Sequence, residues 1–118
     1  MENVLIVDDS KFSRKTTRIL LEKLGYNVIG EAVDGLDGIE KLNELKPDLI
    51  VTDLEMPNLD GVSMVKRIRE AKNDVKILVV TSMVSSQIIQ EVIRHRTTIV
   101  KKPVKESIFI NALKQLDR

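Results

Sequence analysis

The sequence predicts an α/β protein built on a doubly wound sheet of five parallel strands with five helices. Three observations support this prediction. Short runs of β-branched and other apolar residues alternate with longer segments whose apolar residues recur at helical spacing. Glycine, proline and capping residues separate the two kinds of segment. This alternation is typical of strand–helix–strand units, which place helices on both faces of a parallel sheet.

Each predicted strand is a run too short for a helix, rich in Val and Ile, and bounded by charged or turn residues. Residues 56–61 carry turn chemistry and predict a loop. The predicted strands are residues 4–8, 28–32, 48–53, 75–81 and 99–101.

Capping and breaking residues bound the helices. Ser10 and Asp34 are suited to cap the first two, which end near Gly25 and before Pro47. The last helix is predicted at residues 107–116, with its apolar residues facing inward or nearly so. The apolar residues at helical spacing are Phe12, Ile19, Leu20, Leu24, Ile39, Leu42, Leu45, Val62, Val65, Ile68, Ile88, Ile89, Val92, Ile93, Ile108, Ile110, Leu113 and Leu116.

Composition narrows the class of protein. A chain of 118 residues is expected to be one domain, residues 1–118, with an ordinary apolar fraction of 42%. The formal net charge of +1 gives no field that would attract nucleic acid or an anionic membrane. The absence of Cys excludes disulfides and thiolate sites. The start of the chain is neither a secretory signal nor a membrane span, so we expect a cytoplasmic protein.

Charged side chains follow several of the predicted strands at the point where each strand ends. Asp8 and Asp9 close the first strand, Asp53 closes the third, and Lys102 follows the fifth. The fourth strand ends in the hydroxyl of Thr81. The carboxyl ends of parallel strands line the ligand crevice of such a sheet. The strand order 2-1-3-4-5 is attractive because it makes the first and third strands neighbours, so that the three aspartates share one pocket.

Such a pocket needs a cation. Two carboxylates ~4 Å apart repel by about 4 kcal/mol at an effective dielectric near 20. Mg²⁺ suits oxygen ligands, and the backbone carbonyl of Glu55 can add to them. A carboxylate beside bound metal can act as a nucleophile toward phosphorus and form an aspartyl phosphate. Lys102 and Thr81 can supply a positive charge and a hydroxyl donor to the phosphoryl oxygens.

The whole chain resembles the receiver domains of two-component response regulators, and among them the single-domain chemotaxis type. The resemblance implies a flavodoxin-like fold with the strand order 2-1-3-4-5. It rests on motifs that occur in the family's order and spacing. These are residues 5–10 with the acidic pair, residues 47–57 followed by Asp60-Gly61, residues 79–82 with the switch hydroxyl, and residues 101–103 with the lysine.

The resemblance also implies roles in phosphorelay signal transduction. The phosphoryl donor would be a sensor histidine kinase or phosphotransfer protein, and the chain would catalyse only its own phosphorylation and dephosphorylation. In this scheme Asp53 accepts the phosphoryl group, Thr81 and Lys102 bind it, and Asp8, Asp9, Asp53 and the Glu55 carbonyl hold Mg²⁺.

The family's output face, made by the fourth helix, fifth strand and fifth helix, would bind an output protein. We expect a monomer that binds neither nucleic acid nor membrane directly. The positions that match the output face are Arg94, Ile99, Lys101, Val104 and Ile108.

The sequence departs from the family near that face. Ile99 stands where an aromatic residue commonly rotates inward, which predicts a softer switch. Residues 94–98 replace the usual Gly-Ala turn, and Ser82 replaces a more usual alanine. Glu55 and Met83 occupy positions that tune phosphoryl lifetime in the family, and their side chains also suit solvated loop residues.

Other interpretations remain open. Singly, Asp8 or Asp9 would suit a helix cap, Lys102 a surface lysine and Thr81 a strand threonine. Glu55 stands where an aspartyl-phosphate phosphatase needs an acid/base carboxylate, although the chain leaves no room for a substrate cap. A receiver-like interaction module that never uses phosphate is a further hypothesis. A nucleotide site is not expected, because no Gly-Lys-Ser/Thr phosphate loop exists.

Overall fold

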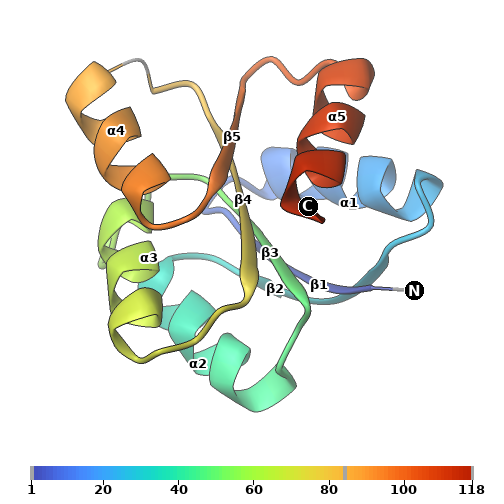
Figure 1. Ribbon diagram of the computed structural model, residues 1–118. Helices are drawn as coiled ribbons and strands as arrows, with labels where there is room; N and C mark the ends of the chain where they lie inside the picture. The colour runs from blue at the N-terminus through green and yellow to red at the C-terminus, as the bar shows by residue number, and fades with distance from the viewer. Residues whose placement is uncertain (1, 84, 118) are drawn as a thin grey trace.

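The computed structural model describes residues 2–83 and 85–117, so the first and last residues of the predicted domain 1–118 lie outside it. Within these residues, five parallel strands form one sheet in the order β2-β1-β3-β4-β5 (Figure 1). The predicted fold class and strand order are confirmed. The strands are β1 (Asn3–Val7), β2 (Asn27–Ala32), β3 (Leu49–Thr52), β4 (Lys76–Thr81) and β5 (Thr98–Lys101).

Each of the four helices that connect successive strands begins at a residue whose side chain caps it, whereas the last helix, which follows β5, has no side-chain cap. The Ser10 and Asp34 side chains accept hydrogen bonds from backbone N–H groups in the first turns of α1 and α2, as predicted. Gly25 has a φ of +92°, which favours glycine after α1. No helix of the described chain has the length and apolar character needed to span a bilayer. The helices are α1 (Lys11–Lys23), α2 (Gly35–Leu45), α3 (Gly61–Glu70), α4 (Ser86–Arg94) and α5 (Glu106–Leu116).

The core has two layers, one on each face of the sheet. Helices α2, α3 and α4 cover one face, and α1 and α5 cover the other (Figure 1). Side chains of β1 alternate between them, with Leu5 and Val7 in the first layer and Val4 and Ile6 in the second. The central strands are therefore buried on both faces.

Some apolar residues at helical spacing do not face the core. The predicted inward position of Ile108 is wrong, because it is 49% exposed while its neighbour Phe109 is buried. Phe12 and Ile19 of α1 are also exposed, and Leu21 is the residue that this helix buries. In α5 three consecutive apolar residues leave the inward direction undetermined by periodicity alone.

Candidate functional site

The ends of β1 and β3 meet at the carboxyl edge of the sheet. Val7 pairs with Thr52, so the next residues, Asp8 and Asp53, leave the sheet side by side. The Asp53 N–H donates to the Val7 carbonyl at 3.0 Å, and the Asp8 N–H donates to the Ala32 carbonyl at 3.0 Å. These backbone hydrogen bonds fix the backbone positions from which the two carboxylate side chains extend.

Lys102 joins the two carboxylates. Its ammonium donates to Asp53 Oδ2 at 2.8 Å and to Asp8 Oδ2 at 3.4 Å. Asp8 and Asp53 are buried, whereas the Lys102 side chain is 26% exposed. Burial by itself lowers the pKa of Lys102, but the hydrogen bond and charge of Asp53, followed by Asp8, outweigh it and leave the pKa raised. The ammonium is therefore held in its charged form.

The Asp53 carboxylate is also oriented from its own loop. Its Oδ1 accepts the Leu54 N–H at 2.6 Å and the Glu55 N–H at 3.4 Å. A Cβ at Gly61 would lie 2.3 Å from the Asp53 carbonyl oxygen, so glycine lets the start of α3 approach the backbone here. One carboxylate oxygen is thus held by the backbone while the other meets Lys102.

Thr81 brings a buried hydroxyl to the same edge. It ends β4, pairs with Lys101 of β5 and has no exposed surface. Its Oγ1 accepts the N–H of Met83 at 3.1 Å. Its carbonyl accepts the N–H of Lys102 at 2.9 Å. Thr81 therefore connects Lys102 to the start of the β4–α4 connection.

Asp9 and the Glu55 side chain are exposed and stay outside the carboxylate–lysine cluster. Across residues 2–83 and 85–117, no group of three or more Asp, Glu, His or Cys side chains is placed to hold a metal ion. The structure brings Asp8, Asp53 and Lys102 together. The complete ligand set of Asp8, Asp9, Asp53 and the Glu55 carbonyl stays a prediction.

The Asp8–Asp53 pair nevertheless fits magnesium chemically. Two buried carboxylates converge on one cationic position, and the nearby donors are oxygens. Mg²⁺ typically uses one or two carboxylates, retains waters and shares phosphate oxygens. The pair thus supplies the oxygen ligands that such a site requires from the protein.

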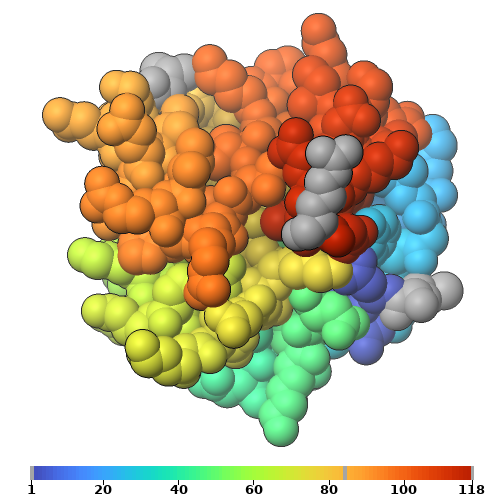
Figure 2. All heavy atoms as spheres, in the orientation of Figure 1, coloured from blue at the N-terminus to red at the C-terminus, as the bar shows by residue number. Residues whose placement is uncertain are grey.

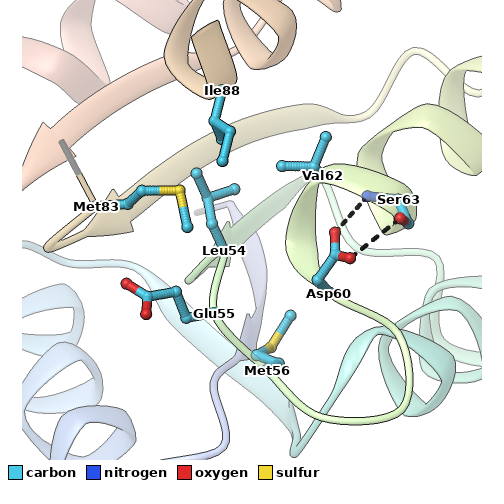
Figure 3. Close-up of a pocket in the computed structure, with 8 residues that line it drawn as sticks. All are labelled: Leu54, Glu55, Met56, Asp60, Val62, Ser63, Met83 and Ile88. Atoms are coloured by element: carbon cyan, nitrogen blue, oxygen red, sulfur yellow. Dashed lines mark hydrogen bonds between the residues drawn. The ribbon is translucent and has the colours of Figure 1, made fainter. Parts of the chain in front are cut away.

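An open pocket of about 490 Å³ lies beside the loop that follows Asp53. Figure 3 shows Met83 and Ile88 facing Leu54 across it, with Met56 and Glu55 on the loop side. Met83, Ile88 and Met56 are half-buried and pack against the core layer of α2, α3 and α4. The β4–α4 connection thus has open space next to it.

Two contacts at the site had no signal in the sequence. The Arg14 guanidinium donates to the Asp8 carbonyl at 2.7 Å. The Asn58 amide donates to Asp34 Oδ2 at 2.6 Å and ties the loop after Asp53 to the start of α2. Sequence patterns do not reveal which backbone carbonyl or cap a long side chain will reach.

Comparison with known proteins places this geometry in a family. Residues 4–114 match the model of the response regulator receiver domain. The chemotaxis protein CheY of Thermotoga maritima is 34% identical over 118 residues, which cover 99% of this chain and 98% of that protein. The protein-glutamate methylesterase/protein-glutamine glutaminase 1 of Geobacter sulfurreducens is 49% identical over 81 residues, and these span 68% of this chain but only 22% of that enzyme.

Solved structures agree with the sequence matches. A chain of the CheX–CheY–BeF3–Mg complex from Borrelia burgdorferi superposes with a TM-score of 0.91 at 25% identity, covering 99% of this chain and 90% of that one. The response regulator domain of Thermotoga maritima CheB superposes with a TM-score of 0.85 at 31% identity, covering 99% and 94%.

Proposed function

This chain belongs to the receiver domains of two-component response regulators, which act in phosphorelay signalling, and we propose that it is a phosphorylation switch with Asp53 as phosphoacceptor. One observation carries the proposal. The Lys102 ammonium lies 2.8 Å from Asp53 and 3.4 Å from Asp8, although these residues are far apart in the sequence. A buried carboxylate beside a second carboxylate and a fixed cation is suited to accept a phosphoryl group.

In the proposed transfer, a carboxylate oxygen of Asp53 attacks the phosphorus of a phosphohistidine on a partner. An O–P bond forms, the P–N bond breaks, and the histidine ring nitrogen leaves with the electron pair and takes a proton from solvent. Asp8, Asp9, Asp53 and the Glu55 carbonyl would hold Mg²⁺, which when bound neutralises charge on the phosphoryl oxygens. The protein contributes by positioning the oxygen and by supplying positive charge.

Lys102 and Thr81 would bind the phosphoryl group after transfer. Lys102 already contacts Asp53 and can move its ammonium to a phosphoryl oxygen. The Thr81 oxygen accepts the Met83 N–H, so turning the hydroxyl toward Asp53 weakens a bond that holds the β4–α4 connection. Because a pocket adjoins Met83, this connection has space to rearrange. Phosphorylation would thereby shift the population of two surface arrangements.

The output partner would bind the face formed by α4, β5 and α5, which is turned toward the viewer in Figure 2. Arg94 and Ile108 are exposed there, with side-chain exposure of 71% for Arg94 and residue exposure of 49% for Ile108. Lys101 is exposed, whereas Ile99 and Val104 are half-buried. A shift of α4 would change this surface directly.

The phosphodonor, a sensor histidine kinase or phosphotransfer protein, would approach on the side of α1. A second pocket of about 420 Å³ lies between α1 and the segment after β5, and Lys102 and Val104 line it. Phe12 lines the same pocket and is 80% exposed. The apolar surface of this pocket lies beside the proposed phosphoacceptor. It is suited to dock a partner that meets this receiver domain, residues 1–118, in the cytoplasm.

Intact-mass measurement tests the assignment of Asp53. With Mg²⁺ and acetyl phosphate the wild-type protein should gain one phosphoryl group, and Asp53→Asn should gain none. Asp60→Asn is the matched control, because Asp60 caps α3 in the same loop and Asn also caps well. Labelling of Asp53→Asn at the wild-type rate, or loss of labelling in Asp60→Asn alone, would contradict the assignment.

A further inference from the structure

Arg14 of α1 reaches back to the peptide that joins the two acidic residues after β1. Its Nη1 donates to the Asp8 carbonyl at 2.7 Å, and this carbonyl belongs to the Asp8–Asp9 peptide. The Arg14 side chain is only 15% exposed. A charged donor at this distance makes a strong hydrogen bond, so the peptide is held in one orientation.

Glu31 of β2 braces Arg14. Glu31 Oε1 accepts from Arg14 Nε at 3.0 Å, and Oε2 accepts from Arg18 Nε at 2.8 Å. The Glu31 carbonyl also accepts from Lys41 Nζ at 2.6 Å, so neighbouring helices hold this strand residue. Arg14 therefore has its carboxylate partner on one side and the Asp8 carbonyl on the other, which leaves its guanidinium little freedom.

The peptide orientation matters for Asp9. The Asp8 N–H is bonded to the Ala32 carbonyl, and Asp8 Oδ1 accepts the Ser10 N–H at 2.9 Å. With the Asp8 carbonyl held by Arg14, every polar group of Asp8 has a fixed partner. Asp9 itself is exposed, so the direction of its side chain depends on the backbone that carries it.

We propose that Arg14, braced by Glu31, is a positioning residue that orients the Asp8–Asp9 peptide so that the Asp9 carboxylate can reach a magnesium ion at Asp53. This inference rests on the proposed function, because it takes Asp9 as a magnesium ligand. Partners that orient metal ligands commonly change metal affinity by about 10–100-fold when they are removed.

Electrostatics and positioning predict opposite results for Arg14. The guanidinium is a cation near the site, so charge repulsion alone predicts that its removal strengthens Mg²⁺ binding. Positioning predicts that its removal weakens Mg²⁺ binding. A purely structural role in packing α1 against β2 predicts lower stability with unchanged affinity for the ion.

Calorimetric titration with Mg²⁺ distinguishes these possibilities, with circular dichroism as the check on folding. Arg14→Gln should bind Mg²⁺ about tenfold more weakly than wild type. Arg18→Gln is the matched control. Arg18 contacts the same Glu31 carboxylate, and its substitution removes the same charge but leaves the bond between Arg14 and the Asp8 carbonyl in place. Its affinity should stay near that of the wild type. At saturating Mg²⁺ the acetyl phosphate labelling rate of Arg14→Gln should return toward wild type.

Equal weakening in both variants, or unchanged or tighter binding in Arg14→Gln, would overturn the inference. If Arg14→Gln does not fold, Arg14→Lys and Glu31→Gln replace it, since each keeps part of the network and should show a smaller loss of affinity. If wild type neither binds Mg²⁺ nor becomes labelled, the proposed function itself fails. If wild type does both and Arg14→Gln binds the ion equally well, only the positioning role fails.

Discussion

The two ends of the sheet each carry a lysine between two carboxylates, and their surroundings differ. At the amino end, Lys76 Nζ lies 2.7 Å from Glu2 and 2.5 Å from Asp117. The side chains there are 37%, 29% and 50% exposed. At the carboxyl end, Lys102 makes the same kind of contacts at 2.8 and 3.4 Å. Each cluster therefore contains one lysine and two carboxylates, but the two clusters lie in different environments.

The two clusters differ in how deeply their carboxylates are buried. The side chains of Asp8 and Asp53 are 7% and 11% exposed. Burial lowers the pKa of both lysines, but for Lys76 it is weaker than the hydrogen bonds to Asp117 and Glu2, which chiefly raise the pKa. For Lys102 burial is the largest single influence on the pKa, and Asp53 and Asp8 together outweigh it. A solvated cluster can lose its cation to water at small cost, but a buried pair of carboxylates requires a cation. Only the carboxyl end is suited to exchange one cation for another.

Removing each lysine should have the largest effect and tests the comparison directly. In the presence of a chelator, Lys102→Met should lower the free energy of unfolding by about 3 kcal/mol, because Asp8 and Asp53 stay buried without a cation. Lys76→Met should lower it by less than about 1 kcal/mol, because its partners are solvated. Urea unfolding at neutral pH measures both.

Added Mg²⁺ serves as the control for this pair of variants. Compared with wild type at the same Mg²⁺ concentration, the ion should reduce the stability deficit of Lys102→Met and leave the deficit of Lys76→Met unchanged. Equal costs for the two substitutions would mean that the environments do not differ energetically, and the comparison would fail.

Magnesium binding should distinguish the two ends through single aspartates. At a hundred times its dissociation constant, Mg²⁺ should stabilise wild type by about 2.7 kcal/mol. Asp9→Ala should lose most of this gain, whereas Asp117→Ala at the amino end should keep it. Thermal unfolding with and without Mg²⁺ measures the gain. The same stabilisation in all three proteins would remove Asp9 from the ligand set.

A smaller effect is expected at Thr81, the last residue of β4, which begins at Lys76. Thr81→Val should cost about 1 kcal/mol, because the Met83 N–H loses its acceptor. Amide hydrogen exchange at Met83 should become faster, and Thr81→Ser should keep the wild-type rate. Unchanged exchange in the valine variant would show that the hydroxyl does not hold the β4–α4 connection.

The fold could be predicted because local signals agree along most of the chain. Caps such as Ser10 and Asp34 and the β-branched runs all indicate the same alternation, and the sheet has the expected order. The inward face of α5 could not be predicted from the sequence, because Ile108 and Phe109 are adjacent and only tertiary packing determines which of them is buried. Propensity places an element, but tertiary contact decides its rotation.

The candidate site could likewise be predicted only in part from the sequence. Charged residues at strand ends indicated where Asp53 and Lys102 would lie, since parallel strands share a carboxyl edge. The sequence could not show that Lys102 contacts both carboxylates while Asp9 remains exposed, because side-chain direction depends on the turn after β1. Nor could it show Arg14 on the Asp8 carbonyl, because a backbone acceptor carries no residue-specific signal.

Glu31 reverses the arrangement seen at both ends of the sheet, with one carboxylate between two arginines, and should give the smallest effect. Burial raises its pKa, but hydrogen bonds from Arg18 and Arg14 outweigh burial and leave the pKa below 4.5. A carboxylate whose pKa is lowered in the folded state contributes stability above its unfolded pKa, and this stability is lost as the pH falls through the folded pKa.

Glu31→Gln should therefore cost less than about 1 kcal/mol at neutral pH, since the ion pairs of Glu31 with Arg14 and Arg18 are partly solvated. The difference from wild type should shrink below pH 4.5, as measured by urea unfolding across that range. A difference that stays constant with pH would mean that the loss reflects packing of the side chain, and that ionised Glu31 does not hold the two arginines.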